Sequence, residues 1–203
     1  MTVAIIQYNA GNTCSVSFAL ERLGVTPLIT EDISAIQIAD KVIFPGVGEA
    51  STAMMYLKER KLDEVIKNLK QPVLGICLGM QLLCNHSEEN DTDCLGIFDT
   101  NVRRFSFSES LNGMDGARLK VPQVGWNKLE DRAAPLFSNI NIEPYCYFVH
   151  SYYAALCEQT TSVTEYGIKF SAALEKDNFY GVQFHPEKSA AVGEQILKNF
   201  LNL

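Results

Sequence analysis

The stretch Pro72-Val-Leu-Gly-Ile-Cys-Leu-Gly-Met-Gln-Leu-Leu83 decides the fold, because it runs from an apolar strand into a helix with a thiol at the junction. Gly75, Cys77 and Gly79 have the G-x-C-x-G spacing of a nucleophile elbow, where small flanking residues allow the sharp bend that exposes the reactive atom. The dipole of the following helix favours a thiolate. The alternative is a buried, inert cysteine, as most cysteines in apolar runs are, and the elbow alone leaves both possibilities open.

Strands and helices alternate around this elbow in the first half of the chain. Short apolar runs predict strands at 3–7, 42–44 and 73–76. Apolar residues at helical spacing predict helices at 15–23, 50–57 and 62–69, and a further helix that begins near Leu78. This alternation predicts an α/β fold, with a parallel sheet that helices cover on both faces.

The second half of the chain has a different character. Alternating or aromatic runs predict mostly antiparallel strands at 117–121, 145–149, 168–174 and 179–184, joined to the same core. A closing helix is predicted at 190–201, and the polar stretches 87–93 and 105–116 are predicted to be surface loops. We expect one domain over 1–203, because a chain of 203 residues is too short for two full-sized domains.

Composition argues against several classes of function. A formal net charge of −7 disfavours a nucleic-acid partner, which requires clustered Lys and Arg. No run approaches the roughly 20 apolar residues of a membrane span, and residues 1–8 lack leader features, so we expect a cytoplasmic protein. The six cysteines include no C-x-x-C pair and no Cys/His cluster, so we expect reduced thiols, no metal site and no cofactor.

A thiolate nucleophile needs a base, and His185 has the most suggestive surroundings of the three histidines. Pro186 pushes His185 toward an extended conformation, in which Glu187 would lie on the same face. A carboxylate on one ring nitrogen would fix the tautomer and leave the other nitrogen free to exchange a proton with Cys77. A surface histidine at a strand end is the alternative, but the combination with the elbow suggests acyl transfer through a thioester.

The tetrahedral intermediate of acyl transfer requires donors for its oxyanion. The N–H of Leu78, directly after the nucleophile, is one candidate. The glycine-rich turn Pro45-Gly-Val-Gly48 follows a predicted strand and could supply the other, although most such turns only reverse the chain. For His150, at the end of an aromatic strand, a structural role is favoured over a pocket role, and His86 is assigned no proton transfer.

Two motifs together resemble the class I (triad) glutamine amidotransferases: the elbow and the segment Gly181-Val-Gln-Phe-His-Pro-Glu187. The resemblance covers nearly the whole chain. It implies a three-layer flavodoxin-like fold with a mostly parallel central sheet and additional antiparallel strands in the C-terminal half. It also implies hydrolysis of glutamine to glutamate, with the ammonia passed to a synthase site.

Within this class the chain is similar to the glutaminase subunits of imidazole glycerol phosphate synthase, from histidine biosynthesis. Four stretches carry the similarity: Pro45-Gly-Val-Gly48, Pro122-Gln-Val-Gly-Trp-Asn127, Phe148-Val-His-Ser-Tyr-Tyr153 and His185-Pro-Glu-Lys-Ser189. The resemblance makes Cys77 the nucleophile, His185 the general base and acid, and Glu187 the residue that orients it.

The same resemblance implies which residues hold the glutamine: Gly48, Gln81, Glu89, Ser151 and Tyr152. Val47 and Gly48 would contain the second oxyanion donor. A carboxylate such as Glu89 also suits the α-ammonium group of the substrate. Because Glu88 is adjacent, a shift of one position in this loop would exchange the two.

The partner that the resemblance implies is a (β/α)₈-barrel cyclase, in a heterodimer. It uses the ammonia to convert PRFAR, a phosphorylated ribulosyl aminoimidazole carboxamide nucleotide, into imidazole glycerol phosphate and AICAR. Gln123, Trp126 and Asn127 are the candidate contacts. Trp126 could instead pack in the core, and family members often have histidine where this chain has Gln123.

Three other functions stay open on the sequence. The chain could supply ammonia to another acceptor, as the small subunits of anthranilate or aminodeoxychorismate synthase do. It could also be a stand-alone cysteine γ-glutamyl hydrolase, which would be active without a partner. The third possibility is a non-catalytic binding subunit that retains the elbow as a relic.

Overall fold

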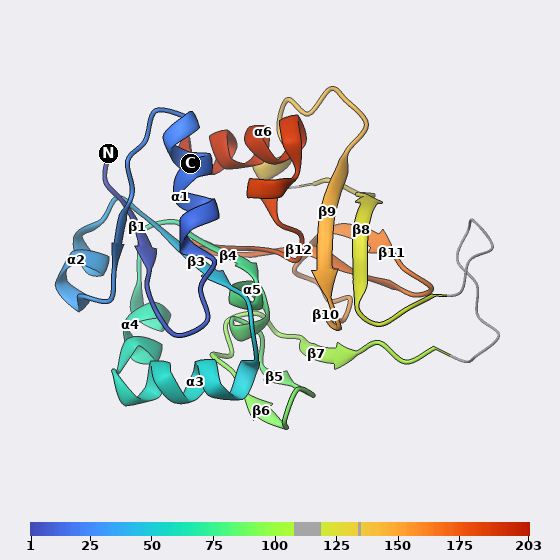
Figure 1. Cartoon of the computed structure of the whole chain (residues 1–203), viewed down its shortest axis with the longest axis horizontal. Helices are drawn as coiled ribbons and strands as arrows, with labels where there is room; N and C mark the ends of the chain where they lie inside the picture. The colour runs from blue at the N-terminus through green and yellow to red at the C-terminus, as the bar shows by residue number, and fades with distance from the viewer. Residues whose placement is uncertain (108–118, 134) are drawn as a thin grey trace.

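The computed structural model describes residues 1–107, 119–133 and 135–203 (Figure 1). Its main sheet has seven strands in the order β11-β12-β13-β4-β3-β1-β2. The strands β1, β2, β3, β4 and β13 run parallel, whereas β12 and β11 pair antiparallel at one edge. Their bounds are β1 Val3–Ile6, β2 Leu28–Thr30, β3 Lys41–Gly46, β4 Val73–Cys77, β11 Thr160–Glu165, β12 Lys169–Lys176 and β13 Phe179–Val182. The mostly parallel sheet with added antiparallel strands is therefore confirmed.

Helices cover both faces of this sheet and complete three layers (Figure 1). Along the buried strands successive side chains point to opposite faces: Ile5 and Ile43 pack with α1 and α6, while Ile6 and Phe44 pack with α2, α3, α4 and α5. The helix bounds are α1 Thr13–Arg22, α2 Ile33–Ile38, α3 Ala50–Glu59, α4 Leu62–Asn68, α5 Leu78–Leu82 and α6 Ala190–Leu201. The predicted helices are thus confirmed, and among the described residues the α-helix that was missed is α2.

Smaller sheets, built from strands between α5 and β11, flank the main one. The strands β8 (Gln123–Lys128) and β9 (Tyr145–His150) form an antiparallel pair. A four-stranded sheet has the order β10-β7-β5-β6, with bounds β5 His86–Ser87, β6 Thr92–Asp93, β7 Asn101–Arg104 and β10 Tyr152–Ala154. Two short 3₁₀ turns complete this part of the chain: η1 (Pro135–Phe137) precedes β9, and η2 (Pro186–Lys188) follows β13.

Three expectations about the second half need correction. The strand predicted at 117–121 is wrong for 119–121, and 117–118 lie outside the described residues; the strand begins at Gln123, after Pro122, which has no N–H for a ladder bond. The strands β7, β10 and the Thr-rich β11 were missed altogether. The loop predicted at 87–93 contains strand residues of the β5–β6 hairpin, and the loop predicted at 105–116 lies mostly outside the described residues.

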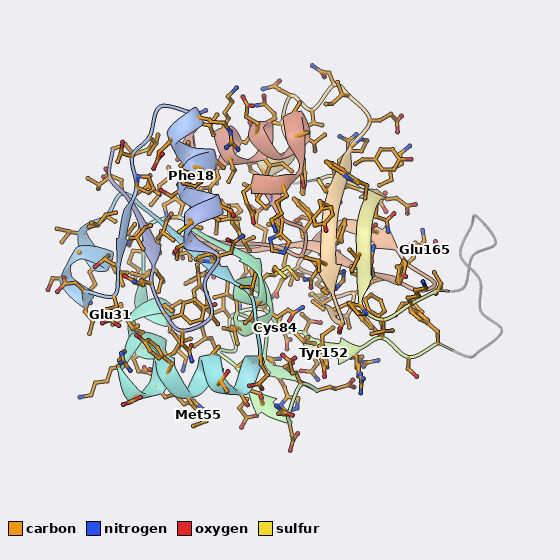
Figure 2. The ribbon with its side chains drawn as sticks, in the orientation of Figure 1. Phe18, Glu31, Met55, Cys84, Tyr152 and Glu165 are labelled. Atoms are coloured by element: carbon orange, nitrogen blue, oxygen red, sulfur yellow. The ribbon has the colours of Figure 1, made fainter. Side chains whose placement is uncertain are left out.

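Side chains divide into a buried interior and an exposed surface, as Figure 2 shows for Cys84 inside and Phe18 and Met55 outside. All six cysteines are free. Within the described ranges, the helices are too short or too polar to cross a bilayer.

Candidate active site

The elbow places Cys77 at the junction of β4 and α5. Cys77 ends the strand with φ 54° and ψ −111°, a conformation that is rare and strained for a residue other than glycine. Two residues later, α5 passes so close to β3 that a Cβ on Gly79 would overlap the carbonyl oxygen of Phe44. The small residue at 79 lets the helix pack here, and the strained backbone at 77 turns the thiol out of the strand.

The base lies on the neighbouring strand. The strand β13 pairs with β4 in parallel, with Val182 opposite Ile76, so His185 follows β13 where Cys77 ends β4. His185 Nδ1 and Glu187 Oε1 are 2.8 Å apart, and each side chain is only 1% exposed. The expected contact forms and His185 is extended, as predicted (φ −98°, ψ 97°), but the backbone after it folds into the turn η2. Pro186 begins that turn, which folds Glu187 back onto the ring.

The protonation of His185 reflects its charged neighbours. Burial alone would lower the pKa of His185, but Cys77 and Glu187 stabilise the imidazolium and raise that pKa above its ordinary value. Because Glu187 occupies Nδ1, the other ring nitrogen is the one available for proton exchange. Nε2 is buried and has no hydrogen-bond partner among the described residues. The arrangement suits a histidine that accepts a proton from a thiol and later donates it.

A cavity of about 310 Å³ opens beside the elbow. All five residues expected to hold glutamine line it, together with Cys77 and both predicted oxyanion donors; the lining is Val47, Gly48, Cys77, Leu78, Gln81, Glu89, Pro122, Val149, His150, Ser151 and Tyr152. The cavity brings together residues from five separate parts of the sequence at the carboxyl ends of β3 and β4, where open α/β sheets place their ligands.

The structure distinguishes the two adjacent glutamates. Glu89 lines the cavity, and its Oε2 accepts a hydrogen bond from the N–H of Ala50 at 2.8 Å. Burial raises the pKa of Glu89, although the Ala50 hydrogen bond opposes this. Glu88 is exposed and accepts instead from the N–H of Arg104 at 2.7 Å. Glu89 is therefore the carboxylate placed to meet an ammonium group in the cavity.

The glycine-rich turn holds one predicted donor away from the cavity. The N–H of Val47 donates to the carbonyl oxygen of Ala10 at 2.6 Å. Gly48 has φ 116°, a value that side-chain-bearing residues rarely adopt. The N–H of Val47 is thus engaged with Ala10 and does not point into the cavity. The other predicted donor, the N–H of Leu78, belongs to the first residue of α5, directly after the nucleophile.

His150 is fixed in the cavity wall. Its Nδ1 lies 2.6 Å from the carbonyl oxygen of Tyr152 and its Nε2 lies 3.0 Å from Gln123 Oε1. Burial, and to a smaller extent the nearby His185, lowers the pKa of His150 to about 4. His150 is therefore neutral at pH 7. Its Nδ1–H donates to the Tyr152 carbonyl oxygen, so its Nε2 accepts, and the Gln123 amide turns its NH₂ group toward the ring. This arrangement suits the structural role predicted for His150.

The three interface candidates lie on β8 but differ in exposure. Trp126 is 52% exposed and meets the ring of Tyr147 edge-on. Gln123 is buried against His150, and Asn127 donates from its amide to the carbonyl oxygen of Glu165 at 2.8 Å. Around Trp126 the outer face of the β8–β9 pair exposes two further apolar side chains, Val124 and Tyr145.

Sequence reasoning missed three residues that contact this machinery. Gln183 donates to Cys77 Sγ, and strand alternation with His185 could have revealed it, because residues two apart share a face. Asn12 Nδ2 donates to Glu187 Oε1 at 3.3 Å, and Ala10 accepts from Val47. The last two lie far from their partners in sequence, and no motif marks them.

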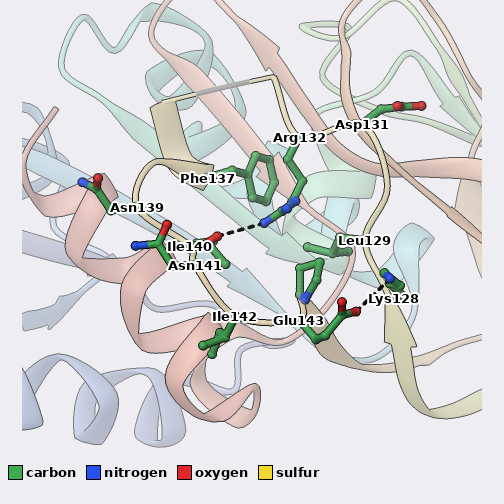
Figure 3. Close-up of a pocket in the computed structure, with 11 residues that line it drawn as sticks. Lys128, Leu129, Asp131, Arg132, Phe137, Asn139, Ile140, Asn141, Ile142 and Glu143 are labelled. Atoms are coloured by element: carbon green, nitrogen blue, oxygen red, sulfur yellow. Dashed lines mark hydrogen bonds and ion pairs between the residues drawn. The ribbon is translucent and has the colours of Figure 1, made fainter.

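A larger hollow of about 700 Å³ lies at the other end of the β8–β9 pair (Figure 3). An ion pair of 2.7 Å between Lys128 and Glu143 crosses its edge, and Arg132 donates to the carbonyl oxygen of Ile140. No member of the triad and no predicted glutamine residue is part of its lining. The chemistry therefore belongs to the smaller cavity at the elbow.

Comparisons with known proteins agree with this geometry. Residues 5–203 match the family described as glutamine amidotransferase class-I. The imidazole glycerol phosphate synthase subunit HisH of Bacteroides thetaiotaomicron is 55% identical over 203 residues, covering 100% of both chains. HisH of Pectobacterium atrosepticum is 47% identical over 205 residues, again covering 100% of both. A crystal structure of a glutamine amidotransferase shares the fold, with a TM-score of 0.74, 17% identity and coverage of 100% of this chain and 98% of that one. The chain therefore belongs to the class I glutamine amidotransferase family, and within it to the HisH subunits of imidazole glycerol phosphate synthase.

Proposed function

We propose that this chain hydrolyses L-glutamine to glutamate and ammonia as the glutaminase subunit of an imidazole glycerol phosphate synthase. One observation carries the proposal: the buried His185–Glu187 pair lies at the end of the strand next to the strained, cavity-lining Cys77. A thiol, a base and a residue that orients the base are the parts of a cysteine hydrolase. The description of the matching family supplies glutamine as the substrate, and the names of the HisH relatives supply the synthase.

The reaction proceeds through a thioester. The sulfur of Cys77 attacks the side-chain amide carbon of glutamine, while His185 takes the thiol proton. The carbonyl oxygen becomes an oxyanion, which accepts a hydrogen bond from the N–H of Leu78. His185 then gives its proton to the amide nitrogen, the C–N bond breaks and ammonia leaves. Water, deprotonated by His185, attacks the thioester and releases glutamate, and the thiol regains its proton.

The cavity supplies recognition of the amino acid end of glutamine. Glu89 faces the α-ammonium group, because it is the cavity carboxylate. Gly48, Gln81, Ser151 and Tyr152 surround the rest of the substrate as the resemblance implies. A volume of about 310 Å³ is large enough for one amino acid of this size.

The hydrogen bond from Val47 to Ala10 supports a resting state of the isolated chain, in which the oxyanion site is incomplete and glutamine hydrolysis is slow. With that N–H turned to Ala10, the cavity has the Leu78 donor but lacks the second one. Loss of one oxyanion donor costs about 10²–10³ in kcat. Rotation of the Val47–Gly48 peptide would supply it, and Gly48 makes such a rotation sterically inexpensive. We infer that the partner and its nucleotide favour the rotated state.

The partner is a cyclase subunit with a (β/α)₈ barrel, which binds the apolar outer face of the β8–β9 pair. This face is continuous with the cavity mouth, since Pro122 and Val149 belong to the cavity lining and Val124 and Trp126 to the face. Ammonia released into water is protonated and lost as a nucleophile, so the mouth must open into the partner. Exposed aromatic residues such as Trp126 are suited to anchor the contact.

The test of the function is Cys77→Ala in the assembled complex. Glutamine-dependent synthesis of imidazole glycerol phosphate should be lost, while synthesis with added ammonia stays close to that of the unmodified complex. Cys157→Ala, at a partly buried cysteine outside the cavity, is the matched control and should keep both activities. If Cys77→Ala loses both activities, the thiol serves the fold or the interface instead.

The resting state has a separate test. Steady-state hydrolysis of glutamine is measured for the chain alone, with the cyclase, and with the cyclase plus PRFAR. Activity should rise stepwise across the three conditions. Full activity of the chain alone would show that the Val47–Ala10 contact does not limit hydrolysis. Product formed with an anthranilate-type synthase in place of the cyclase would refute the assigned acceptor.

A further inference from the structure

We propose that Gln183 is a positioning residue that orients the sulfur of Cys77 and stabilises its thiolate form. This inference rests on the proposed function, since it assigns Cys77 as the nucleophile. Gln183 follows the last residue of β13 and is fully buried. Its backbone N–H donates to the carbonyl oxygen of Ala172 at 2.9 Å, which fixes the start of the side chain.

A chain of hydrogen bonds runs from the cavity wall to the sulfur. Gln81 Nε2 donates to the carbonyl oxygen of Tyr152 and to Gln183 Oε1, each at 2.9 Å. Gln183 Nε2 in turn lies 3.6 Å from Cys77 Sγ, within hydrogen-bond distance for sulfur. Two buried amides therefore connect the substrate cavity to the nucleophile.

Only one orientation of the two amides satisfies this chain. The carbonyl oxygen of Tyr152 can only accept, so the end of the Gln81 amide that faces it must be the NH₂ group. The second N–H of that group points to Gln183, whose facing atom must then be the oxygen. The NH₂ group of Gln183 is left facing Cys77. The donor to sulfur is thus determined by the network.

Two titratable side chains, His185 and Tyr8, lie near the sulfur, and both are unchanged in Gln183 variants. Apart from them, the sulfur lies between the Gln183 donor and one acceptor. As a thiol, Cys77 can donate to the carbonyl oxygen of Val149, 3.9 Å away. As a thiolate it is repelled by that carbonyl and attracted by the Gln183 N–H. A hydrogen bond donated to a charged group is stronger than one between neutral groups, so Gln183 favours the ionised form.

The test measures the reactivity of Cys77 toward iodoacetamide between pH 6 and 9.5, using the full chain. The modified Cys77 peptide is quantified by mass spectrometry, because the chain has six cysteines. In Gln183→Met we expect alkylation at neutral pH to slow about tenfold and the pH profile of alkylation to move to higher pH. A purely structural role of Gln183 would not move this profile.

Two further variants keep the test decisive. Thr164→Val removes an equally buried polar group on β11, far from the elbow in sequence, and should leave the profile unchanged. Gln183→Glu retains the acceptor for Gln81 but replaces the donor that faces sulfur, so it should slow alkylation even if Gln183→Met fails to fold. A folded Gln183 variant whose profile coincides with that of the unmodified chain would overturn the inference.

The alkylation assay is independent of glutamine. If Cys77→Ala kept glutaminase activity, the proposed function would fail while the Gln183 profile could still shift. Conversely, Cys77→Ala could abolish glutamine-dependent synthesis while the alkylation profile of a Gln183 variant stays unchanged. That result would refute the role of Gln183 and leave the proposed function intact.

Discussion

His150 should make the stability of this protein depend on pH between about 4 and 6.5. The unfolded chain has an ordinary histidine pKa of 6.5, whereas burial lowers that of the folded His150 to about 4. Between these values the unfolded chain binds more protons than the folded one, so the free energy of unfolding falls as the pH falls. The contribution of the neutral, buried His150 to the free energy of unfolding is fully present above about pH 6.5.

The size of the effect follows from the two pKa values. At pH 5 the unfolded His150 is nearly all protonated and the folded one mostly neutral, which costs about 2 kcal/mol relative to pH 7.5. Urea unfolding at both pH values, for the unmodified chain and for His150→Gln, measures it. Other titrating groups, such as Glu89 and His185, occur in both proteins, so their contributions largely cancel in the comparison.

The unmodified chain should therefore lose about 2 kcal/mol more than His150→Gln between pH 7.5 and 5. The variant itself is expected to be less stable at pH 7.5, because Gln123 and the Tyr152 carbonyl lose a rigid partner. An equal loss in both proteins would refute the reasoning, since it would mean that His150 does not titrate differently on folding.

Two predictions concern the packing that supports the elbow. Gly79→Ala should lower the free energy of unfolding by at least about 3 kcal/mol, because the added methyl group would overlap the Phe44 carbonyl; a normal urea midpoint would contradict this. Tyr8→Phe removes the buried hydroxyl that donates to the Pro45 carbonyl oxygen at 2.7 Å and should cost about 1–2 kcal/mol. Unchanged thermal unfolding of Tyr8→Phe would show that the bond contributes little.

Much of the fold was predictable because its information is local. The apolar spacing of 190–201 predicts the helix that α6 forms, and the glycines around Cys77 predict the strand-to-helix bend. The strand β11 was missed because its threonines and serine look like a loop. Ser162 and Thr164 are nonetheless buried, since their hydroxyls donate to the carbonyl oxygens of Glu130 and Lys128. These hydrogen bonds to residues distant in sequence stabilise the strand, and the local sequence does not reveal them.

The site divides in the same way. Cys77, His185 and Glu187 each stand in a short motif, so the sequence points to all three. Their juxtaposition depends on sheet order, which periodicity does not reveal: β13 could have paired elsewhere. The contact of Asn12 with Glu187 joins residues 175 positions apart, and nothing in either segment predicts it.

The position of β13 has a consequence for how the protein is made. This strand lies between β4 and β12 in the sheet, although the ribosome makes it about a hundred residues after Cys77. A growing chain therefore has its thiol long before it has its base, and α6 has yet to cover one face of the sheet. A chain that ends before residue 185 has Cys77 but lacks His185 and Glu187, so it cannot activate the thiol by the proposed route.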